Sequence, residues 1–359
     1  MDRDTVAVYE HRAAEWVGRR RPTDGPAAEA FAESVVPGSW RADLGCGPGW
    51  HAEHLGGPLV ALDAALSMAK LARARSPMAA VVQGDLEALP FRSGSLGGAW
   101  AHSSYLHVPA MRLPMALSDL HRALVIGAPI EVKVHTGERP AGWVDDFEGR
   151  LFASWTPEAL SDVVTGAGFE VDDVSLTGGE RSEWVRVGAT RLRSLADTVG
   201  ADMRLLLVGL NPSEIAADTG IAFARPGNRF WPAAQAAGVV TRDRDPRGAL
   251  LVDRVGLTDL CKRPTPRAHW LTDEEYRAGV PRLVRLVEWL RPGVVCFTGL
   301  AGYRAAVAPR ATVGWQNRDL GGRPVYVMPS PSGVNRNTSF DALVQHLRTA
   351  VAGPPPGLR

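Results

Sequence analysis

The residues best suited to chemistry in the second half of the chain lie in RLLLVGLNPS, residues 204–213. Its apolar run is typical of a buried parallel strand. A strand that leads to a nucleotide site usually ends in glycines, whereas this one places Asn211 between Gly209 and Pro212. A side-chain amide can hold a water molecule by hydrogen bonding, but it cannot remove a proton as a carboxylate would. Asn211 therefore reads as a water-positioning residue with no strong general base beside it.

A second candidate site follows the strand in ADLGCGPGW, where Gly45, Gly47 and Gly49 come in quick succession. Glycines let the backbone turn sharply and approach a ligand closely. PLVALDAALSM ends its strand at Asp63, and VVQGDLEALPF ends its strand at Asp85. An acid at the first of these positions can accept hydrogen bonds from ribose hydroxyls, as in dinucleotide folds. Asp85 is placed to meet an adenine amino group.

Two units, each with alternating strands and helices, are predicted to position these residues. From 41 to 135, short apolar strands alternate with helical segments, and strand signals in FEVDDVSL and SEWVRVGA close this unit near residue 190. RLRSLADTVGAD then reads as a helical connector. The predicted fold class is α/β, with two domains that each hold a mainly parallel sheet flanked by helices. The expected boundaries are 1–190, a connector over 191–203, a second domain over 204–350, and a disordered tail over 351–359.

Composition excludes several classes of protein. The chain of 359 residues suffices for two domains. It has no apolar run approaching ~20 residues, and its polar N-terminus is not a secretory signal. The three cysteines are far apart, and the pair His51 and His54 lacks further ligands, so no metal site is expected. We expect a cytoplasmic protein, associated with the nucleoid if the source is bacterial, with no membrane partner.

The two halves differ in charge. From Arg204 onward the sequence has 21 Lys and Arg against 12 Asp and Glu, which leaves 19 against 27 in the preceding part. A basic second half favours a polyanionic partner. The alternative is compositional, because only Lys70, Lys133 and Lys262 are lysines and heavy use of arginine can reflect genome base content.

The first half resembles the class I S-adenosylmethionine-dependent methyltransferases over roughly residues 1–190. The resemblance rests on DLGCGPG, LDAALSM, GDLEALPF and ASWTPEALSDVVTGAGFEV. It implies that Asp63 holds the ribose of S-adenosylmethionine, that Asp85 and Leu86 hold the adenine, and that Tyr9 covers the site. The residues implied to cradle the methionine part are Asp43, Gly45, Gly47 and Gly49.

The methyl acceptor is unknown. AHSSYLHVP stands where amino-methylating DNA enzymes carry an Asn/Asp-Pro-Pro-aromatic loop, and no Pro-Cys nucleophile is present. Methylation of DNA bases of the known kinds is therefore not expected. His102, Tyr105 and His107 either act on an acceptor or are pocket and packing residues. A domain that keeps the fold without turnover is the other alternative.

The second half resembles the mismatch-specific uracil-DNA and thymine-DNA glycosylases of the uracil-DNA glycosylase superfamily. GLNPS, GIAFARPGNRFWP and VYVMPSPSGVNR carry the resemblance, and LTDLCKRPT and SFDALVQHL extend it over about 203–350. Such an enzyme takes a base out of the duplex stack. It then stabilises an oxocarbenium-like sugar and an anionic departing pyrimidine. The resemblance gives Asn211 the role of placing the attacking water.

The same resemblance implies two further sets of residues. Phe223 would stack on the extruded base, a contact worth ~1–3 kcal/mol, while Asn228 either contacts the base or orders its loop. Val334 would fill the hole left by the base, and Arg336 would contact the strand or the opposite guanine. The base pocket would comprise Gly209, Leu210, Pro212, Ser213, Phe223 and Asn228, and the DNA contacts Ser330, Ser332, Gly333, Val334 and Arg336. Candidate phosphate contacts are Arg225, Arg229, Lys262 and Arg263.

Departures from the family pattern limit the assignment of substrate. Ser213 stands where many relatives have glycine, which leaves open whether thymine fits beside uracil. The absence of Asp from GLNPS argues against the fast uracil-specific branch, and the scattered cysteines argue against iron–sulfur members. No lysine stands in the matched loops, so no lyase step is expected.

These patterns predict a methyltransferase that uses S-adenosylmethionine, joined to a glycosylase that needs no cofactor. The expected partner is double-stranded DNA with uracil or another mismatched or damaged pyrimidine opposite guanine. Two alternatives remain. The second half is a nucleic-acid-binding module attached to a working methyltransferase, or the chain is a damage-binding scaffold without activity.

Overall fold

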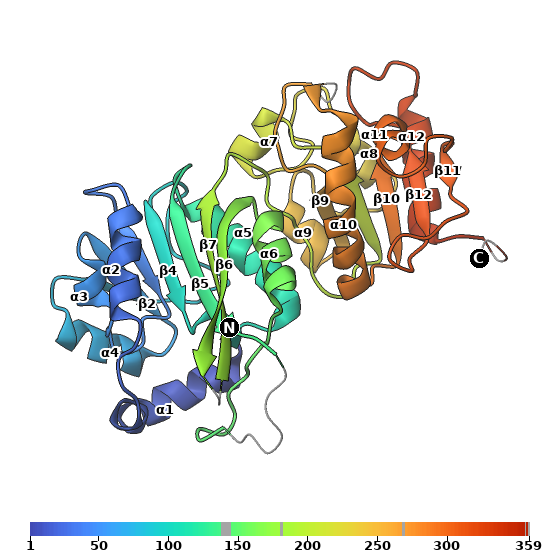
Figure 1. Cartoon of the computed structure of the whole chain (residues 1–359). Coiled ribbons are helices and arrows are strands. Elements are labelled where there is room, and N and C mark those ends of the chain that lie inside the picture. The colour runs from blue at the N-terminus through green and yellow to red at the C-terminus, as the bar shows by residue number, and fades with distance from the viewer. Residues whose placement is uncertain (138–144, 180–181, 268–269, 356, 358–359) are drawn as a thin grey trace. The chain divides into compact units, whose positions relative to one another are not determined.

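The structure, a computed structural model, describes residues 1–137, 145–179, 182–267, 270–355 and 357. The chain divides into two compact units. The first comprises Met1–Thr165 and Phe169–Leu192, and the second comprises Gly166–Gly168 and Arg193–Arg359. Each unit has its own mostly parallel sheet with flanking helices (Figure 1), so the predicted fold class is confirmed.

The first unit contains a seven-stranded sheet in the order β3-β2-β1-β4-β5-β7-β6. Its strands are β1 (Arg41–Leu44), β2 (Leu59–Asp63), β3 (Ala80–Gln83), β4 (Gly98–His102), β5 (Pro129–His135), β6 (Phe169–Gly179) and β7 (Ser182–Arg191). The first five strands are parallel, whereas β7 pairs antiparallel with both β5 and β6. From β3, at one edge of the sheet, the chain crosses back to β4, which lies beside β1. The strand order therefore reverses between β1 and β4, and the carboxyl ends of these two strands border a crevice that suits a ligand.

Helices cover both faces of this sheet (Figure 1). They are α1 (Arg3–Arg19), α2 (Gly25–Ser34), α3 (Ala52–Leu55), α4 (Leu66–Arg75), α5 (Leu113–Ala123) and α6 (Pro157–Gly166), with short 3-10 helices η1 (Tyr105–His107) and η2 (Ala110–Arg112). In α5 the residues Leu113, Ala116, Leu117 and Leu120 are fully buried. Their spacing of three and four residues places them on one helix face, which explains why this segment folds as a helix against the sheet.

The second unit contains a five-stranded sheet in the order β11-β12-β10-β8-β9. Its strands are β8 (Leu205–Gly209), β9 (Val255–Asp259), β10 (Val294–Thr298), β11 (Gly314–Trp315) and β12 (Val325–Met328). Only β11, at one edge, is antiparallel. Strand β8 has its successor β9 on one side and β10 on the other. The strand order therefore reverses at β8. Leu210 follows this strand directly, and Asn211 comes next.

The helices of the second unit are α7 (Glu214–Thr219), α8 (Phe230–Ala236), α9 (Pro246–Leu251), α10 (Asp273–Leu290), α11 (Leu300–Ala306) and α12 (Phe340–Ala352). A capping box formed by Thr272 and Glu275 begins α10. Helix α12 ends at Ala352, so the first two residues of the predicted tail are helical. Val351 packs against the core, which extends the helix beyond 350. Of the remaining tail, residues 356, 358 and 359 lie outside the described residues.

The connector between the predicted domains is not helical. Residues 192–203 contain no helix, and Thr198 forms an isolated bridge with Leu257. Asp197 is buried and bound to Arg282 and Lys262, both at 2.7–2.8 Å. These ion pairs and the buried Leu195 bind the segment to the second unit. The helical prediction was wrong because tertiary contacts outweigh the segment's local preference.

Gly279 tests how tightly α10 packs on the segment after β9. Replacing glycine by alanine inside a helix usually stabilises it by about 1 kcal/mol. Here a Cβ on Gly279 would lie 1.9 Å from the backbone oxygen of Leu260. Leu260 is held in place because its backbone N–H donates to the oxygen of Gly209. We expect Gly279→Ala to lower the free energy of unfolding by about 1–3 kcal/mol.

Urea unfolding of the whole chain measures this effect. The exposed Ala278, one residue earlier in the same helix, provides the control. Ala278→Ser should change the free energy of unfolding by no more than about 0.5 kcal/mol. A Gly279→Ala variant as stable as the original protein would contradict the close packing.

Candidate functional sites

The carboxyl ends of four strands in the second unit border a cavity of about 150 Å³. Asn211 follows β8, Asp259 ends β9, Thr298 ends β10 and Ser330 follows β12. Parallel strands place their carboxyl ends at one edge of a sheet, which is why residues distant in sequence meet here. Every residue predicted for the base pocket lines this cavity, as do Ser330 and Ser332.

The amide of Asn211 is fixed through its nitrogen. Nδ2 donates to the backbone oxygen of Arg263 at 2.9 Å, to Oγ1 of Thr265 at 2.8 Å and to the oxygen of Pro212 at 3.1 Å. Thr265 is buried and donates its own hydroxyl proton to the oxygen of Arg267. Within the described residues nothing donates to Oδ1 of Asn211. The oxygen is therefore left to accept a hydrogen bond from a ligand or a water molecule in the cavity.

Thr265 was missed by the sequence analysis, although LTDLCKRPT was recognised as a matching stretch. It stands 54 residues after Asn211, in a segment without regular secondary structure. Only the folded chain shows that its hydroxyl oxygen orients the catalytic candidate. The signal in the sequence was a small hydroxyl residue within a recognised motif, which is weak by itself.

Phe223 lies in the cavity wall with a left-handed backbone, at φ 58°. A large residue rarely adopts this conformation, so the surrounding loop must hold it. Its ring centroid is 4.3 Å from that of Phe230, which in turn meets Trp231 edge-on at 5.2 Å. Phe230 and Trp231 are core residues. The aromatic core thus fixes the Phe223 ring at the cavity.

Other predicted pocket residues have local structural roles. Oδ1 of Asn228 accepts from the backbone N–H of Phe230, which supports its loop-ordering alternative. Ser213 is the N-cap of α7, and its hydroxyl accepts from the N–H of Ala216 at 3.2 Å. The side chain of Leu210 packs on Gly302, where an added Cβ would lie 2.0 Å from Cδ2 of Leu210. Base contacts by these residues stay predictions.

The loop of residues 330–336 is braced from within the second unit. Arg229 donates to the oxygens of Asn335 and Thr338, both at 2.7 Å. A Cβ on Gly333 would lie 2.5 Å from the oxygen of Gly227, so this glycine allows the two loops to approach each other. Val334 is left 76% exposed at the end of the loop, and Arg336 is also exposed.

The predicted phosphate contacts stay predictions, although each of these four side chains already has a partner in the second unit. Arg229 braces the loop just described, and the half-buried Lys262 binds Asp197 at 2.8 Å. Arg263 forms a salt bridge with Glu275, while Arg225 donates to the oxygen of Pro266. Both of these arginines are exposed. A residue's charge in the sequence does not reveal which partners it has in the folded chain.

A carboxyl group also lines this cavity. Asp259 ends β9 opposite Gly209 in the strand register. Its Oδ1 lies over Gly209 so closely that a Cβ there would be 2.2 Å away. Burial raises the pKa of Asp259 to about 6, and nearby Asp197 acts in the same direction.

The first unit contains a larger cavity, of about 540 Å³. Among the predicted cofactor residues, its lining includes Tyr9, Gly45, Gly47, Asp63 and Leu86. Asp63 accepts from the backbone N–H of Gly47 at 2.8 Å and from that of Ala65 at 2.9 Å. Burial outweighs these hydrogen bonds and raises the pKa of Asp63 to about 6. The carboxylate thus joins the Gly-rich turn to the end of β2.

The structure leaves Asp43, Gly49 and Asp85 outside the lining of this cavity. Asp43 is buried on β1, and its Oδ2 has no hydrogen-bond partner in the described part of the chain. Burial raises its pKa to about 7. Asp85 instead accepts hydrogen bonds from the amino group of Met1, at 2.7 and 2.9 Å. A direct contact of Asp85 with adenine therefore has no support from the cavity's geometry.

The residues present fit a nucleoside cofactor with a charged tail. Gly45 and Gly47 both have left-handed backbones, at φ 76° and 52°. A Cβ on Gly47 would meet no atom within 4 Å, so its backbone opens towards space that a ligand can fill. The carboxyl of Asp63 binds this turn and lines the cavity. It would gain from a cationic or hydroxyl-bearing ligand.

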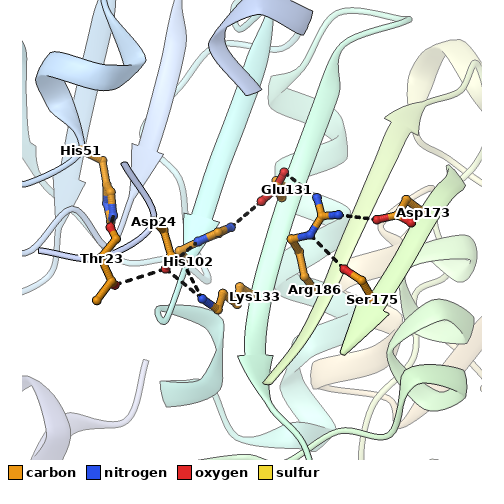
Figure 2. Close-up of polar contacts among 9 residues, drawn as sticks. All are labelled: Thr23, Asp24, His51, His102, Glu131, Lys133, Asp173, Ser175 and Arg186. Atoms are coloured by element: carbon orange, nitrogen blue, oxygen red, sulfur yellow. Dashed lines mark hydrogen bonds and ion pairs between the residues drawn. The ribbon is translucent and has the colours of Figure 1, made fainter. Parts of the chain in front are cut away.

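A chain of charged groups begins in the lining of this cavity and crosses the sheet (Figure 2). The ring of His102 lies between Glu131, at 2.7 Å from Nε2, and Asp24, at 3.4 Å from Nδ1. Lys133 binds Asp24 at 2.8 Å, and Arg186 binds Glu131 at 3.1 Å. His102 also stacks on Trp100 with ring centroids 3.5 Å apart. It lines the cavity while being held rigidly from three directions.

The other two residues that could act on a methyl acceptor, His107 and Tyr105, differ from each other. Nε2 of His107 contacts the Tyr9 hydroxyl at 2.9 Å, and Arg150 donates to the same hydroxyl at 3.0 Å. Burial lowers the pKa of His107 to about 4, so it is neutral near pH 7. Tyr105 is fully buried and does not line the cavity, which supports its alternative role in packing.

The two sheets, with sites at the ends of parallel strands, define two α/β ligand-binding domains. Residues 42–129 match the sequence model of a methyltransferase domain, and residues 196–350 match that of the uracil DNA glycosylase superfamily. The chain therefore carries a methyltransferase domain followed by a domain of the uracil-DNA glycosylase superfamily.

Solved structures with a similar fold include a SAM-dependent methyltransferase from Methanosarcina mazei. It is 15% identical, and the match covers 45% of this chain and 97% of that one, with a TM-score of 0.40. A second, from Mesorhizobium loti, is 21% identical, with 47% and 97% of the two chains covered and a TM-score of 0.40.

No helix among the described residues is both long enough and apolar enough to cross a membrane. No group of three or more His, Cys, Asp and Glu side chains in that part of the chain is arranged to hold a metal ion.

Proposed function

We propose that the second domain is a monofunctional DNA glycosylase. It hydrolyses the bond between deoxyribose and uracil, or another mismatched or damaged pyrimidine, opposite guanine. The observation that carries this proposal is the Asn211 amide, whose nitrogen is fully engaged while its oxygen stays available at the cavity. The basic charge of this half suits a DNA partner.

The proposed reaction begins when the pyrimidine leaves the duplex and enters the cavity. Leaving the stack costs a few kcal/mol, least for a weakly paired base, which favours mismatches. Phe223 is held in place to stack on the base. The exposed Val334 occupies the space that the base leaves in the duplex. These contacts offset the cost of extrusion.

Bond cleavage then follows without a strong base at the sugar. The glycosidic electron pair passes to the pyrimidine as the sugar becomes oxocarbenium-like. Asn211 accepts a hydrogen bond from a water molecule and directs its lone pair at the sugar carbon. Because the amide cannot take the proton, the water attacks only when the base has nearly departed. The chemistry is therefore slow. The attacking water then loses its proton to solvent, and the pyrimidine anion takes up a proton from solvent. The products are a free base and an abasic site.

The first domain is proposed to bind S-adenosylmethionine and to transfer a methyl group to an acceptor of unknown identity. The cofactor supplies an electrophilic methyl group when bound. The backbone of Gly45 and Gly47 would hold its methionine part, with the charge of Asp43 nearby. Asp63 would hold the ribose, and Leu86 would contact the adenine. Tyr9 and His102 border the remaining space, where an acceptor would bind.

The first prediction concerns Asn211. In a labelled duplex with one G·U pair, at about pH 6, Asn211→Ala should release uracil at least about 100-fold more slowly than the original protein, because the water is no longer placed. The exposed Asn317 lies outside the cavity, and Asn317→Ala should leave the rate unchanged. The rates on duplexes with G·T and A·U pairs measure the preference for the released base and for the base opposite it.

Absence of base release from every duplex by the original protein would reject the glycosylase. Mismatch binding without release, retained in Asn211→Ala, would indicate a binding module or scaffold. The methyltransferase would then be the working enzyme of this chain.

Val334 gives a separate prediction about extrusion. Val334→Ala should slow uracil release from a G·U duplex several-fold, since the smaller side chain fills less of the vacated stack. Release from single-stranded DNA should be unaffected, because no stack has to be broken there. Val313, 38% exposed and outside the cavity, provides the matched substitution Val313→Ala. Equal slowing on single and double strands would argue against a wedge.

Cofactor binding is tested at Asp63. A charged hydrogen bond contributes about 1.5–3 kcal/mol, so Asp63→Asn should weaken binding of S-adenosylhomocysteine by about 10-fold or more in isothermal titration. Asp85→Asn serves as the comparison and should change affinity much less, since Asp85 lies outside the cavity lining. A larger effect at Asp85 would restore its assignment to the adenine.

A further inference from the structure

His102 lines the larger cavity, and the proposed methyltransferase leaves its role open. It ends β4 and is only 6% exposed. Two residues later, Ser104 packs against the Gly-rich turn, where a Cβ on Gly45 would lie 2.3 Å from Cβ of Ser104. The loop after β4 therefore lies beside the turn proposed to hold the methionine part of the cofactor. A side chain at this strand end is placed to act on the methyl acceptor.

The two ring nitrogens of His102 face different carboxylates (Figure 2). Nε2 is 2.7 Å from Oε1 of Glu131, a normal hydrogen bond to a group that only accepts. The proton of a neutral His102 therefore lies on Nε2, and the lone pair is on Nδ1. Nδ1 is 3.4 Å from Oδ2 of Asp24, which is longer than a normal hydrogen bond. Asp24 lines the cavity and Glu131 does not, so Nδ1 is the nitrogen on the cavity side.

The charges of this cluster balance without a proton on Nδ1. Lys133 donates to both oxygens of Asp24, at 2.8 and 2.9 Å, and Arg186 donates to Glu131 at 3.1 Å. Each carboxylate beside the His102 ring thus has a cation of its own. A neutral His102 fits this arrangement. Once the ring accepts a proton, it can donate a hydrogen bond to each of the two carboxylates.

Packing fixes the ring of His102. It stacks on the buried Trp100, with ring centroids 3.5 Å apart. The ring of His51 lies edge-on at 6.4 Å, and Nε2 of His51 is 3.0 Å from the backbone oxygen of Thr23. Burial lowers the pKa of His51, so this neighbour is neutral near pH 7. The titratable and charged groups around His102 are therefore Asp24, His51, Glu131, Lys133 and Arg186.

Aromatic side chains continue from His102 along the same face of the sheet. His102 is opposite Lys133 in the β4–β5 register, and His135, two residues later, is opposite Trp184 on β7. Residues two apart on a strand share a face. The ring of His135 stacks on Trp184 at 3.9 Å and lies 5.7 Å from that of Phe152. These three rings line the cavity and form a wall that suits a flat, apolar ligand.

The charged side chains near this wall are largely paired. Arg150 binds Asp145, and Arg20 binds Asp146 at 2.6 Å. The charge of Asp24 is balanced as described above. Placing a charge in a partly buried site without a partner is costly. A neutral acceptor therefore suits this part of the cavity better than a charged one.

We propose that His102 is the general base of the methyltransferase and that the methyl acceptor is a neutral, planar hydroxyl compound of the phenol type. Glu131 is a positioning residue, because it fixes the tautomer and the orientation of the ring. This inference rests on the proposed methyltransferase function and names the acceptor class of the same cavity. A hydroxyl needs such a base, since it is a weak nucleophile until it loses its proton.

The proposed step moves one proton and one methyl group. The hydroxyl proton of the acceptor passes to Nδ1 of His102, which then donates to Asp24 while Nε2 still donates to Glu131. The acceptor oxygen forms a bond to the methyl carbon of S-adenosylmethionine, and the carbon–sulfur bond breaks with its electron pair left on sulfur. The products are a methyl ether, S-adenosylhomocysteine and a proton that His102 releases to solvent.

The first measurement follows the proton without methyl transfer. The whole protein is saturated with S-adenosylhomocysteine, which has no methyl group to transfer, and is then given 4-nitrophenol, a planar probe whose ionised form is coloured. At about pH 6, where an ordinary histidine can accept a proton, the bound probe should be several-fold more ionised than the free probe. His102→Gln keeps a donor for Glu131 but has no basic nitrogen, so its bound probe should be no more ionised than the free one. Glu131→Gln should give an intermediate result.

Methyl transfer to the same probe tests catalysis. With labelled S-adenosylmethionine, His102→Gln should slow methylation of 4-nitrophenol by about 100-fold or more at about pH 6. The loss should shrink as pH rises, because the free probe then ionises without help. 4-Nitroaniline, an amine of similar shape, should not be methylated. His54 and Glu29 form another His–carboxylate pair, at 2.8 Å and outside the cavity lining, and His54→Gln should change neither measurement.

Each other outcome has a defined meaning. If the loaded protein does not bind 4-nitrophenol, or binds it no more ionised than the free probe, the proposal is overturned. Equal ionisation in His102→Gln removes the role of His102, and methylation of 4-nitroaniline instead removes the acceptor class. Failure to bind S-adenosylhomocysteine in isothermal titration rejects the methyltransferase function itself. If His102→Gln does not fold, the comparison of bound and free probe in the original protein still decides the question.

Discussion

Both candidate sites depend on one constraint, which is that parallel strands bring their carboxyl ends to the same edge of a sheet. Within the sheet the backbone groups pair with each other, and beyond its edge the chain must turn. In the second unit this edge collects Asn211, Asp259 and Thr298 from three adjacent strands. In the first unit it collects the Gly-rich turn after β1 and Asp63 at the end of β2. The strands are rigid, so the side chains at their ends are held without a separate scaffold.

The hydrogen bonds of Asn211 fix the orientation of its side-chain amide. An amide can rotate to present either its nitrogen or its oxygen. Here three acceptors, from Pro212, Arg263 and Thr265, surround the nitrogen. Rotation would set an acceptor oxygen against these acceptors, which is unfavourable. The segment after β9 thus determines which atom of the Asn211 amide is left to accept a hydrogen bond in the cavity.

How much of this the sequence could predict depends on whether the signal was local. The fold class, the turn with Gly45 and Gly47, and Asn211 all follow from short stretches read next to a strand. Thr265 binds Asn211, and Asp259 packs on Gly209. Each pair is more than 45 residues apart in the sequence, and no spacing rule reveals it. The partners of the arginines could not be predicted for the same reason. Carbonyl and carboxylate groups elsewhere in the unit bind Arg229 and Arg263.

The buried carboxyl groups of the two units differ in the direction of their pKa shifts. Asp197 is as buried as Asp259, yet two cations lower its pKa. Burial raises the pKa of Asp43, Asp63 and Asp259 to between about 6 and about 7, above their ordinary value of 3.8. For these three, the folded state holds its protons to a higher pH than the unfolded state. Their ionisation therefore lowers stability as pH rises from about 4 to about 7. Asp63 and Asp259 lie at cavity edges, where a ligand that donates hydrogen bonds to them would restore that stability.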